Sequence, residues 1–341
     1  MRRPRATALA VISLLALGAL VIAPAPPAFA CGCGAVVGPD GSTATTSREQ
    51  AIISWNGEEE TMEIAFDLNS GLSDAGLLIP TPTHPVVSAG DARVFALIDD
   101  TIAPTITDQT DWWGLGYVFP PPSEPATRVI KRLEIGPIEA VTLEATDTAS
   151  LALWLNDNGY VLTKGMTDSL QSYIALGWSF TAIKLTGEHA LNGSVDPIRL
   201  TFETSRAVYP MRFGSTDAGP TQLRLYVFDD ARDQVTQANS PTVDIKADVE
   251  VLWAGKVADS RLLAFGSYLT AFDIRYHVPA EDITSDLGFV ADNTTSDVKP
   301  QLTRYRMVTL LGVPVATLVV GWALLGLALL TGHFVGRRRA R

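Results

Sequence analysis

The stretch EQAIISWNGEEETMEIAFDL, residues 49–68, sets the expectation for the fold. Apolar side chains recur at every second position on both sides of Asn56-Gly57. A period of two residues is typical of a strand with one buried face, and an Asn-Gly pair between two such runs favours a tight hairpin turn. The stretch therefore predicts two strands, residues 49–55 and 61–68, paired in an antiparallel hairpin.

Beyond this hairpin the sequence predicts more strands and a small number of helices. Residues 91–102 have apolar side chains at helical spacing, and Asp91 is a suitable N-cap. Two more helices are expected around residues 151–155 and 170–174, the first ended by Asn158-Gly159. Strands are expected at residues 75–79, 129–133, 141–143, 178–185, 198–202, 223–228, 249–253 and 272–276, and the longest irregular loop at residues 104–126. The predicted fold class is α+β, strand-dominated with antiparallel sheets and a few inserted helices.

The two ends of the chain carry signals for export and membrane attachment. Arginines near the N-terminus precede an apolar run and an A-x-A pattern, so residues 1–30 are expected to be a signal peptide cleaved after Ala30. Residues 307–331 contain no charged side chain and, as a helix, would exceed the roughly 30 Å hydrocarbon core of a bilayer. We therefore expect one C-terminal transmembrane helix at residues 307–331.

The flanks of this apolar segment predict its orientation. Four arginines lie in a short tail, residues 332–341, and positive residues favour the cytoplasmic side. Arg304 and Arg306, in the expected linker at residues 296–306, weaken this asymmetry without reversing it. The expected location is the cytoplasmic membrane, with a single-pass topology, the N-terminal domain outside and the basic tail in the cytoplasm.

The segment between the two ends is expected to be an extracytoplasmic domain at residues 48–295, either one unit or two subdomains with a break near residues 190–220. All 37 acidic residues lie within residues 31–303, together with 17 of the 26 basic ones, which gives this part a formal charge of −20. Nucleic acids and anionic lipid surfaces need a basic face on their protein partner. The charge therefore argues against nucleic acid as a partner and permits divalent cations, basic peptides or simple solubility.

The only two cysteines, Cys31 and Cys33, begin a segment rich in Gly, Ser and Thr, residues 31–47, which is expected to be a flexible lead-in. A strained disulfide between Cys31 and Cys33 is one interpretation, because Cα atoms two residues apart can fall within disulfide range. A redox-active or metal-binding pair and a lipidated Cys31 are the alternatives. With no other cysteine, the core must be stable without a disulfide framework.

Seven stretches, in order along the chain, carry a likeness to one bacterial family. They are CGCG at 31–34, REQAIISWNG at 48–57, LLIPTPTHP at 77–85, LALWLNDNGY at 151–160, YIALGWSFTAIK at 173–184, VYPMR at 208–212 and LYVFDD at 225–230. Together they resemble the secreted proteins grouped as domain of unknown function 2330. The resemblance implies an exported or membrane-anchored protein and supplies no catalytic residue, because the family has no established activity.

The chemistry-bearing residues of the domain form no recognisable catalytic motif. Neither a G-x-S-x-G nor an H-E-x-x-H pattern occurs, and His84 is expected in a loop. Asp99-Asp100, Asp229-Asp230 and Glu58-Glu59-Glu60 could serve a carboxylate-based hydrolase, but each is expected to be solvated charge near the end of an element. Two oxygen-rich turns have ligand types suited to calcium without fitting the twelve-residue calcium loop. We expect no catalytic residue, no cofactor and no metal site.

The best candidate for a binding site is an aromatic loop with Trp112, Trp113 and Tyr117. Exposed aromatic side chains on a long loop can stack on sugars or dock a protein partner. The interpretation that the sequence favours for these rings, however, is that they fold back and cover the strands. The other tryptophans of the domain lie on apolar periodic faces and are expected in the core: Trp55, Trp154, Trp178 and Trp253.

These observations together predict a non-catalytic envelope protein that binds or scaffolds another surface component, either another envelope protein or a cell-wall glycan. One alternative is an envelope hydrolase that acts on glycan or peptide through carboxylates. A second alternative is a metal- or redox-responsive module that uses Cys31 and Cys33.

Overall fold

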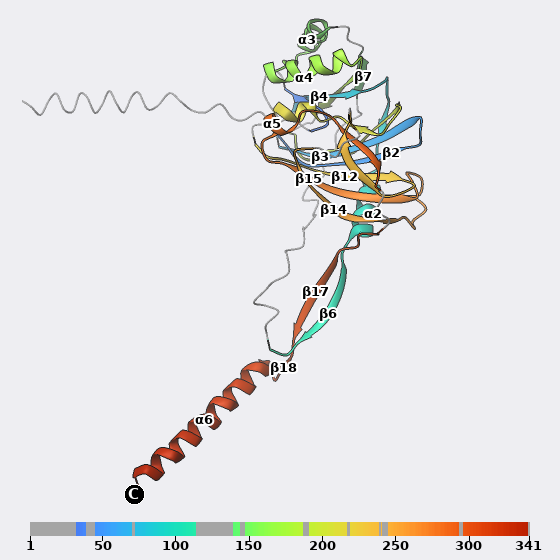
Figure 1. The fold of residues 1–341 in the computed structure, drawn as a ribbon. Helices are drawn as coiled ribbons and strands as arrows, with labels where there is room; N and C mark the ends of the chain where they lie inside the picture. Colours follow the sequence, from blue (N-terminus) through green and yellow to red (C-terminus); the bar gives the residue numbers. More distant parts are fainter. Residues whose placement is uncertain are drawn as a thin grey trace, which may run out of the picture.

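The chain forms a strand-rich domain, a two-stranded stalk and a C-terminal helix that extends away from the domain (Figure 1). The computed structural model describes residues 32–38, 45–69, 72–113, 139–143, 147–186, 191–216, 219–238, 240, 245–292 and 296–339. The strand-dominated α+β class predicted from the sequence is confirmed.

The predicted hairpin is confirmed. Strands β2 (Thr45–Trp55) and β3 (Glu59–Asn69) pair antiparallel, with Ile53 opposite Met62. Between them Gly57 has φ 103°, and the Asn56 side-chain oxygen accepts hydrogen bonds from the backbone N–H groups of Glu58 and Glu59. Asn-Gly supplies this turn because glycine adopts positive φ without steric cost and asparagine caps the turn through its side chain.

This hairpin lies in the middle of an eight-stranded sheet. The strand order is β14-β15-β12-β2-β3-β10-β5, and β9 joins β3. The added strands are β5 (Val86–Ala89), β9 (Asn192–Ser194), β10 (Ile198–Glu203), β12 (Thr221–Asp229), β14 (Asp248–Lys256) and β15 (Tyr268–Tyr276). β12 pairs with β2 in parallel, so this sheet is mixed and differs here from the expected antiparallel sheets. Parallel neighbours need a long crossover connection, and the whole chain between β2 and β12 provides it.

Two smaller sheets pack beside the large one. The first is antiparallel, in the order β1-β4-β8-β7, and consists of β1 (Ala35–Val37), β4 (Asp74–Thr81), β8 (Ser179–Thr186) and β7 (Glu139–Leu143). The second has the order β11-β16-β13 and consists of β11 (Val208–Tyr209), β16 (Leu287–Ala291) and β13 (Asp233–Gln237). A 3₁₀ helix, η2 (Arg212–Thr216), and the short helix α5 (Pro279–Asp282) connect these parts.

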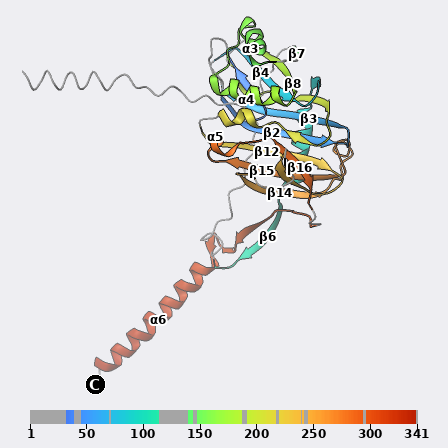
Figure 2. The ribbon, with the colours of Figure 1, turned by 45° about the horizontal axis from the view of Figure 1, so that its top comes forward.

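The domain has four layers, visible from two directions in Figures 1 and 2. Helices α3 (Thr148–Asp157) and α4 (Lys164–Ala175) cover the outer face of the four-stranded sheet. The main core lies between that sheet and the large one, and α2 (Ala92–Ile102) covers the other face of the large sheet. Alternation along β2 shows the arrangement, because Ile53 belongs to the main core whereas Ile52 packs toward α2. The main core takes residues from both sides of positions 190–220.

The start of the described chain corrects one expectation. Residues 32–38 are buried and include strand β1, so the flexible lead-in predicted for residues 31–47 is wrong over this part. A Cβ atom at Gly34 would lie 2.6 Å from the Leu78 carbonyl oxygen, which shows that this glycine permits close packing of two strands. The predicted signal peptide with its cleavage site after Ala30, and Cys31, lie outside the described residues.

The stalk, formed by strands β6 and β17, corrects two more expectations from the sequence. Strand β6 (Thr105–Asp111) pairs in parallel with β17 (Gln301–Met307), so residues 105–111 are not irregular and the expected linker contains a strand. Three threonines and an isoleucine in β6 explain the strand, because β-branched residues favour extended backbone. Residues 114–126 of the expected loop, which include Tyr117, and the expected strand at residues 129–133 lie outside the described residues.

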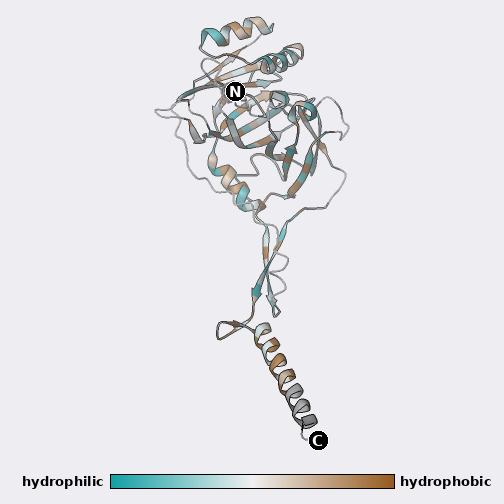
Figure 3. Ribbon diagram, turned by 90° about the vertical axis from the view of Figure 1, so that its left-hand side faces the viewer, coloured by the Kyte–Doolittle hydropathy of each residue, from teal (hydrophilic) through white to brown (hydrophobic). Residues whose placement is uncertain are grey.

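The C-terminal helix begins later than predicted. A small hairpin, β18 (Thr309–Leu310) and β19 (Val313–Pro314), precedes α6 (Val315–Arg339), with positive φ at Leu311 and Gly312 in its turn. The predicted helix at residues 307–331 is therefore wrong at its start, and α6 continues into the expected tail. In Figure 3 the part of the α6 ribbon that is coloured by hydropathy is mainly hydrophobic. Within the described part of the chain, no helix meets the length and hydropathy that crossing a membrane requires.

Candidate functional site

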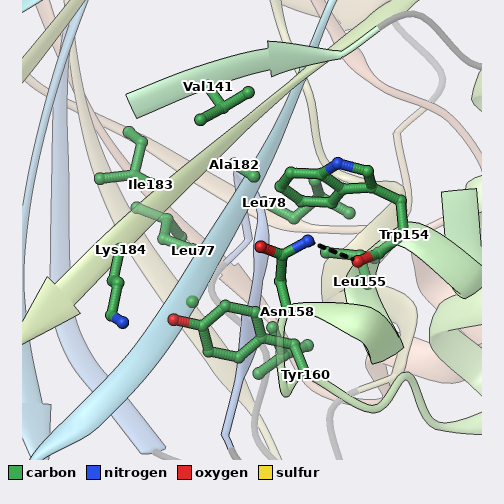
Figure 4. Close-up of a pocket in the computed structure, with 12 residues that line it drawn as sticks. Leu77, Leu78, Val141, Trp154, Leu155, Asn158, Tyr160, Ala182, Ile183 and Lys184 are labelled. Atoms are coloured by element: carbon green, nitrogen blue, oxygen red, sulfur yellow. Dashed lines mark hydrogen bonds between the residues drawn. The ribbon is translucent and has the colours of Figure 1, made fainter. Parts of the chain in front are cut away.

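A groove lies between α3 and the four-stranded sheet, at the end of the domain opposite the stalk (Figures 1 and 4). Its volume is about 140 Å³. Its floor is formed by aliphatic side chains of the sheet, and α3 with the residues that follow it forms the opposite wall. Figure 4 labels Leu77, Leu78, Val141, Trp154, Leu155, Asn158, Tyr160, Ala182, Ile183 and Lys184 among the lining residues.

Local sequence places the wall residues of α3. The Asp147 side chain caps the helix by accepting a 2.8 Å hydrogen bond from the Ser150 backbone N–H. Leu151 and Leu155 are buried beneath the helix, which turns Trp154 toward the groove mouth. Asn158, one turn later, donates from Nδ2 to the Trp154 carbonyl oxygen at 2.8 Å, so its amide is held over the groove.

The opposite end of the groove is polar. The Tyr160 hydroxyl donates to Asp74 Oδ1 at 3.0 Å, and Lys184 Nζ lies 3.6 Å from Asp74 Oδ2. Figure 4 shows the Tyr160 hydroxyl and the Lys184 ammonium at the same end, across the groove from Trp154. The groove thus combines a partly exposed indole, an apolar floor and an amide, a hydroxyl and an ammonium group.

The size of the groove limits what it can hold. Pockets that enclose a whole small molecule usually have about 300–1,000 Å³. A groove of about 140 Å³ that is open to solvent can hold one ring or side chain of a larger ligand. Sequence reasoning placed Trp154 in the core, because its helical face is mostly apolar. The signal that could have located the groove is Asn158, which is four residues after Trp154 and therefore on the same face.

The predicted aromatic loop is only partly described. Trp112 and Trp113 are 57% and 58% exposed, so these two rings do not fold back over the strands. They lie directly after β6 at the end of the stalk, where the Asp111 carbonyl oxygen accepts a 3.1 Å hydrogen bond from the Val308 N–H. The structure therefore places the tryptophan pair next to the β18–β19 hairpin, which is distant from it in the sequence. The groove lies at the other end of the domain.

The candidates for catalysis are not brought together. His84 is exposed, and His277 Nε2 lies 2.7 Å from Asp248 Oδ2 at another exposed position. Asp99 accepts a 3.2 Å hydrogen bond from the Tyr226 hydroxyl, whereas Asp230 lies on the surface. Among the described residues, no group of three His, Cys, Asp or Glu side chains could hold a metal ion.

Glu60 was expected to be a solvated charged residue, and this expectation is wrong. Glu58 and Glu59 are exposed, but Glu60 is fully buried and its Oε2 accepts a 2.8 Å hydrogen bond from the Val208 N–H. Burial raises the pKa of the Glu60 carboxyl well above its usual value. A signal was present in the sequence, because Glu60 has the same parity as the inward-facing Met62 and Ile64.

Three buried carboxylates converge on the VYPMR stretch, residues 208–212. Besides Glu60 at Val208, Glu49 accepts from the Tyr209 hydroxyl and from the N–H groups of Gly32 and Cys33 at 2.7 and 3.0 Å. Asp286 accepts from the Met211 N–H at 2.9 Å, from Arg212 Nε at 2.8 Å and from the Tyr173 hydroxyl at 2.6 Å. Stretches that carry the family resemblance therefore meet at one buried polar network, whose hydrogen bonds fix the position of the 208–212 segment.

A comparison with known proteins agrees with the resemblance seen in the sequence. The model of a family described as an uncharacterized protein conserved in bacteria, DUF2330, matches residues 27–290. The chain belongs to this family. The match includes the groove, the buried carboxylates and most of the layered domain, so these are features of a DUF2330 domain.

The remaining comparisons describe distant likenesses. No curated protein sequence matches this DUF2330 chain. The crystal structure of baculovirus P35 is similar at 8% sequence identity and a TM-score of 0.33, with 74% of this chain and 95% of that chain covered. The structure of a mutated baculovirus P35 after caspase cleavage gives 9% identity, a TM-score of 0.31 and coverage of 74% and 98%.

Proposed function

We propose that the protein is a membrane-anchored binding protein of the bacterial cell envelope, and that its groove beneath α3 holds a sugar unit of a cell-wall glycan. The observation that carries this proposal is Trp154, a partly exposed indole beside an apolar floor with polar groups around it (Figure 4). Pyranose rings have an apolar face of C–H groups and a rim of hydroxyls, so they complement an aromatic face bordered by hydrogen-bonding groups.

The polar groups of the groove have capacity left for a ligand. Lys184 has three ammonium donors and pairs with Asp74 at 3.6 Å, which leaves donors for sugar hydroxyls. The Asn158 side-chain oxygen is an acceptor that its own Nδ2 hydrogen bond to Trp154 does not use. The open shape of the groove suits one ring of a long polymer, whose neighbouring units remain in solvent.

Membrane attachment is proposed through α6. Apolar side chains on successive turns of this helix are exposed, with Trp322 72% and Leu329 68% accessible. A helix with apolar residues on all sides is unfavourable in water, and its free energy falls when protein or lipid surrounds it. The uncharged run at residues 307–331, the arginine-rich tail and the expected signal peptide at residues 1–30 support an anchor with the domain outside.

Two arginines at the end of the stalk share one carboxylate. Arg304 and Arg306, which weaken the charge asymmetry in the sequence, both pair with Asp108 at 2.6 and 3.0 Å. Hydrogen bonding from Arg304 lowers the pKa of the Asp108 carboxyl to about 2, so this group stays ionised at neutral pH. One carboxylate therefore offsets one of the two positive charges at this end of the stalk.

A second role is proposed for Trp112 and Trp113. They lie where the stalk ends, beside the hairpin that carries the exposed Leu310 and Leu311 and leads into α6. Tryptophan is enriched at the boundary between membrane and water, because its ring is apolar and its N–H is polar. The pair would therefore lie at the membrane surface and hold the stalk there.

The glycan proposal is tested with the full-length protein in lipid nanodiscs. Its binding to soluble β-1,4-linked N-acetylglucosamine oligomers and to purified cell-wall glycan is measured for the wild type, Trp154→Ala and Leu153→Ala. Leu153 is a matched control, because it lies on the same helix, is 63% exposed and does not line the groove. We expect Trp154→Ala to weaken binding about tenfold, equivalent to about 1.4 kcal/mol, and Leu153→Ala to leave it unchanged. Equal affinity of the wild type and Trp154→Ala would refute the proposed site.

The role of the tryptophan pair is tested separately by fluorescence quenching. Full-length protein is placed in nanodiscs that contain lipids brominated near the headgroup, and Trp322→Phe removes the tryptophan of α6 from the signal. We expect quenching that decreases in Trp112→Phe/Trp113→Phe. Quenching that is unchanged by the double substitution would show that these two rings lie away from the lipid.

A further inference from the structure

A second cavity lies on another side of the domain, between β13 and the edge of the large sheet formed by β14 and β15. Its volume is about 330 Å³, more than twice that of the groove. Its walls are mainly aliphatic and aromatic, with Val249 and Val251 from β14 and Phe272 from β15. Charged residues lie at one end: Arg232, Asp233 and Asp292.

Two of these three charges compensate each other. Arg232 Nε lies 3.2 Å from Asp292 Oδ2, and both side chains are mostly buried. Arg232 also donates from a terminal nitrogen to the Ser296 carbonyl oxygen at 3.1 Å. The guanidinium is therefore engaged beside the cavity, and the carboxyl of Asp233 is left as the additional acidic group.

Asp233 is an unusual residue to find at this position. It is 2% exposed, and among the described residues its Oδ2 atom has no hydrogen-bond partner. Its backbone N–H donates to Thr270 Oγ1 at 3.0 Å, which fixes the residue on its strand without satisfying the carboxyl. Buried polar atoms without a partner are rare in native proteins, because each lowers the stability of the fold unless something else satisfies it.

Asp233 lines this cavity, so the composition of the cavity indicates which ligand would suit its carboxyl. A carboxyl at one end requires a donor, preferably a cation, and the apolar walls require a ligand with an aliphatic body. A divalent metal ion fits less well, because the described residues contain no group of three suitable ligands. We propose that this cavity binds an alkylammonium group, with Asp233 as its counter-ion. The group could belong to a free diamine or to a lysine side chain of a peptide, since both have the same chemistry.

The state of Asp233 gives this binding a pH dependence. Burial, with a smaller contribution from Asp229 on β12, raises the pKa of the Asp233 carboxyl to about 8. The other charged groups at this end, Arg232 and Asp292, pair with each other, and the cavity residues from β14 and β15 are uncharged. Without a bound cation, the Asp233 carboxyl is therefore mostly protonated at pH 7. When an ammonium group binds, the carboxyl ionises and its proton passes to the buffer.

Calorimetry on the full-length protein tests the inference with two probes, cadaverine and an acetylated lysine methylamide. Pentanol and the matching norleucine derivative are their neutral analogues. We expect both cations to bind, the neutral analogues not to bind, and about 0.9 proton to be released per ligand at pH 7 in buffers of different ionisation enthalpy. Between pH 6 and 7 the affinity should rise nearly tenfold. The probe with the higher affinity identifies the source, diamine or lysine side chain.

Two substitutions complete the test. Asp233→Asn keeps the shape of the residue and removes its charge, so we expect at least tenfold weaker binding and no proton release. Asp230→Asn is the control, because Asp230 is exposed and does not line the cavity. Unchanged binding in Asp233→Asn, or no binding of either cation to the wild type at millimolar concentration, would overturn the inference. The glycan experiment has a different site and probe, so the two proposals can fail independently.

Discussion

Replacing Asp233 by Asn is expected to change how the stability of the protein depends on pH. An aspartate in an unfolded chain has a pKa of about 3.9, whereas in the folded protein the pKa of Asp233 is about 8. Because the folded pKa is the higher one, this group stabilises the fold fully below pH 4. Its contribution is lost as the pH rises toward 8, since the unfolded state ionises and the folded state does not.

The magnitude follows from the difference in pKa. Each unit corresponds to about 1.36 kcal/mol, so the full range is about 5.6 kcal/mol, of which about 3 kcal/mol falls between pH 5.5 and 8.5. Over this interval we expect the free energy of unfolding of the wild type to fall by about 3 kcal/mol relative to Asp233→Asn. A constant cost of burying the asparagine amide would cancel in this comparison.

Urea denaturation followed by tryptophan fluorescence measures both proteins at several pH values, with Asp230→Asn as the control. The wild type and the control should lose stability in parallel, and Asp233→Asn should lose less. If the curves of the wild type and Asp233→Asn stay parallel from pH 5.5 to 8.5, Asp233 does not have a raised pKa and the reasoning is refuted.

Three further predictions follow from other parts of the molecule. A chain that stops after Val308 keeps the whole β6–β17 pairing and loses α6, so it should be released as a soluble protein in cell fractionation; retention in the membrane would point to another attachment, such as lipid on Cys31. Glu49→Gln leaves at least one buried donor without an acceptor and should lower the free energy of unfolding by about 2–3 kcal/mol, whereas the exposed Glu58→Gln should change it by less than about 0.5 kcal/mol. Tyr173→Phe removes the hydroxyl that donates to Asp286 and should cost about 1–3 kcal/mol by the same assay, and an unchanged value would show that this network contributes little.

The elements that sequence predicts well depend on local signals. The β2–β3 hairpin follows from alternation and the Asn-Gly turn, and α2 follows from helical spacing after Asp91, whose side chain does accept a hydrogen bond from the Arg93 N–H. The stop of α3 follows from Asn158-Gly159, where Gly159 has φ 88°. Each of these signals lies within a few residues of the structure that it determines.

The elements that sequence misses depend on distant partners. β6 has no apolar alternation, and its strand structure depends on β17, whose residue Arg304 lies opposite Asp108. β1 is short and follows glycines, and only its burial against β4 distinguishes it from a flexible segment. The pairing expected between Cys31 and Cys33 stays a prediction, although the structure places Cys33 in the main core.

The candidate sites show the same division. Residue type drew attention to Trp112 and Trp113, and the structure then gave them a position at the end of the stalk. The sequence does not identify Asp233 as a site residue, because it is one of many acidic residues in an acidic domain and only the structure shows that it is buried. Trp154 and Lys184 come from different elements, and only the packing of α3 on the four-stranded sheet makes them neighbours in one groove.

If α6 is embedded in a membrane as proposed, the paired stalk sets the distance between the domain and the lipid. A flexible linker of 11 residues would have a root-mean-square length of about 18 Å and no fixed direction. The distance and the orientation of the domain relative to the membrane would then vary. The seven paired residues of β6 and β17 instead form a ribbon about 23 Å long that holds the domain on two strands. With α6 embedded in this way, the groove at the far end of the domain faces away from the lipid (Figure 1). The groove then stays within a narrow range of distances from the membrane surface. Only ligands at that distance from the membrane can reach the groove, so the length of the ribbon limits which ligands the protein can bind.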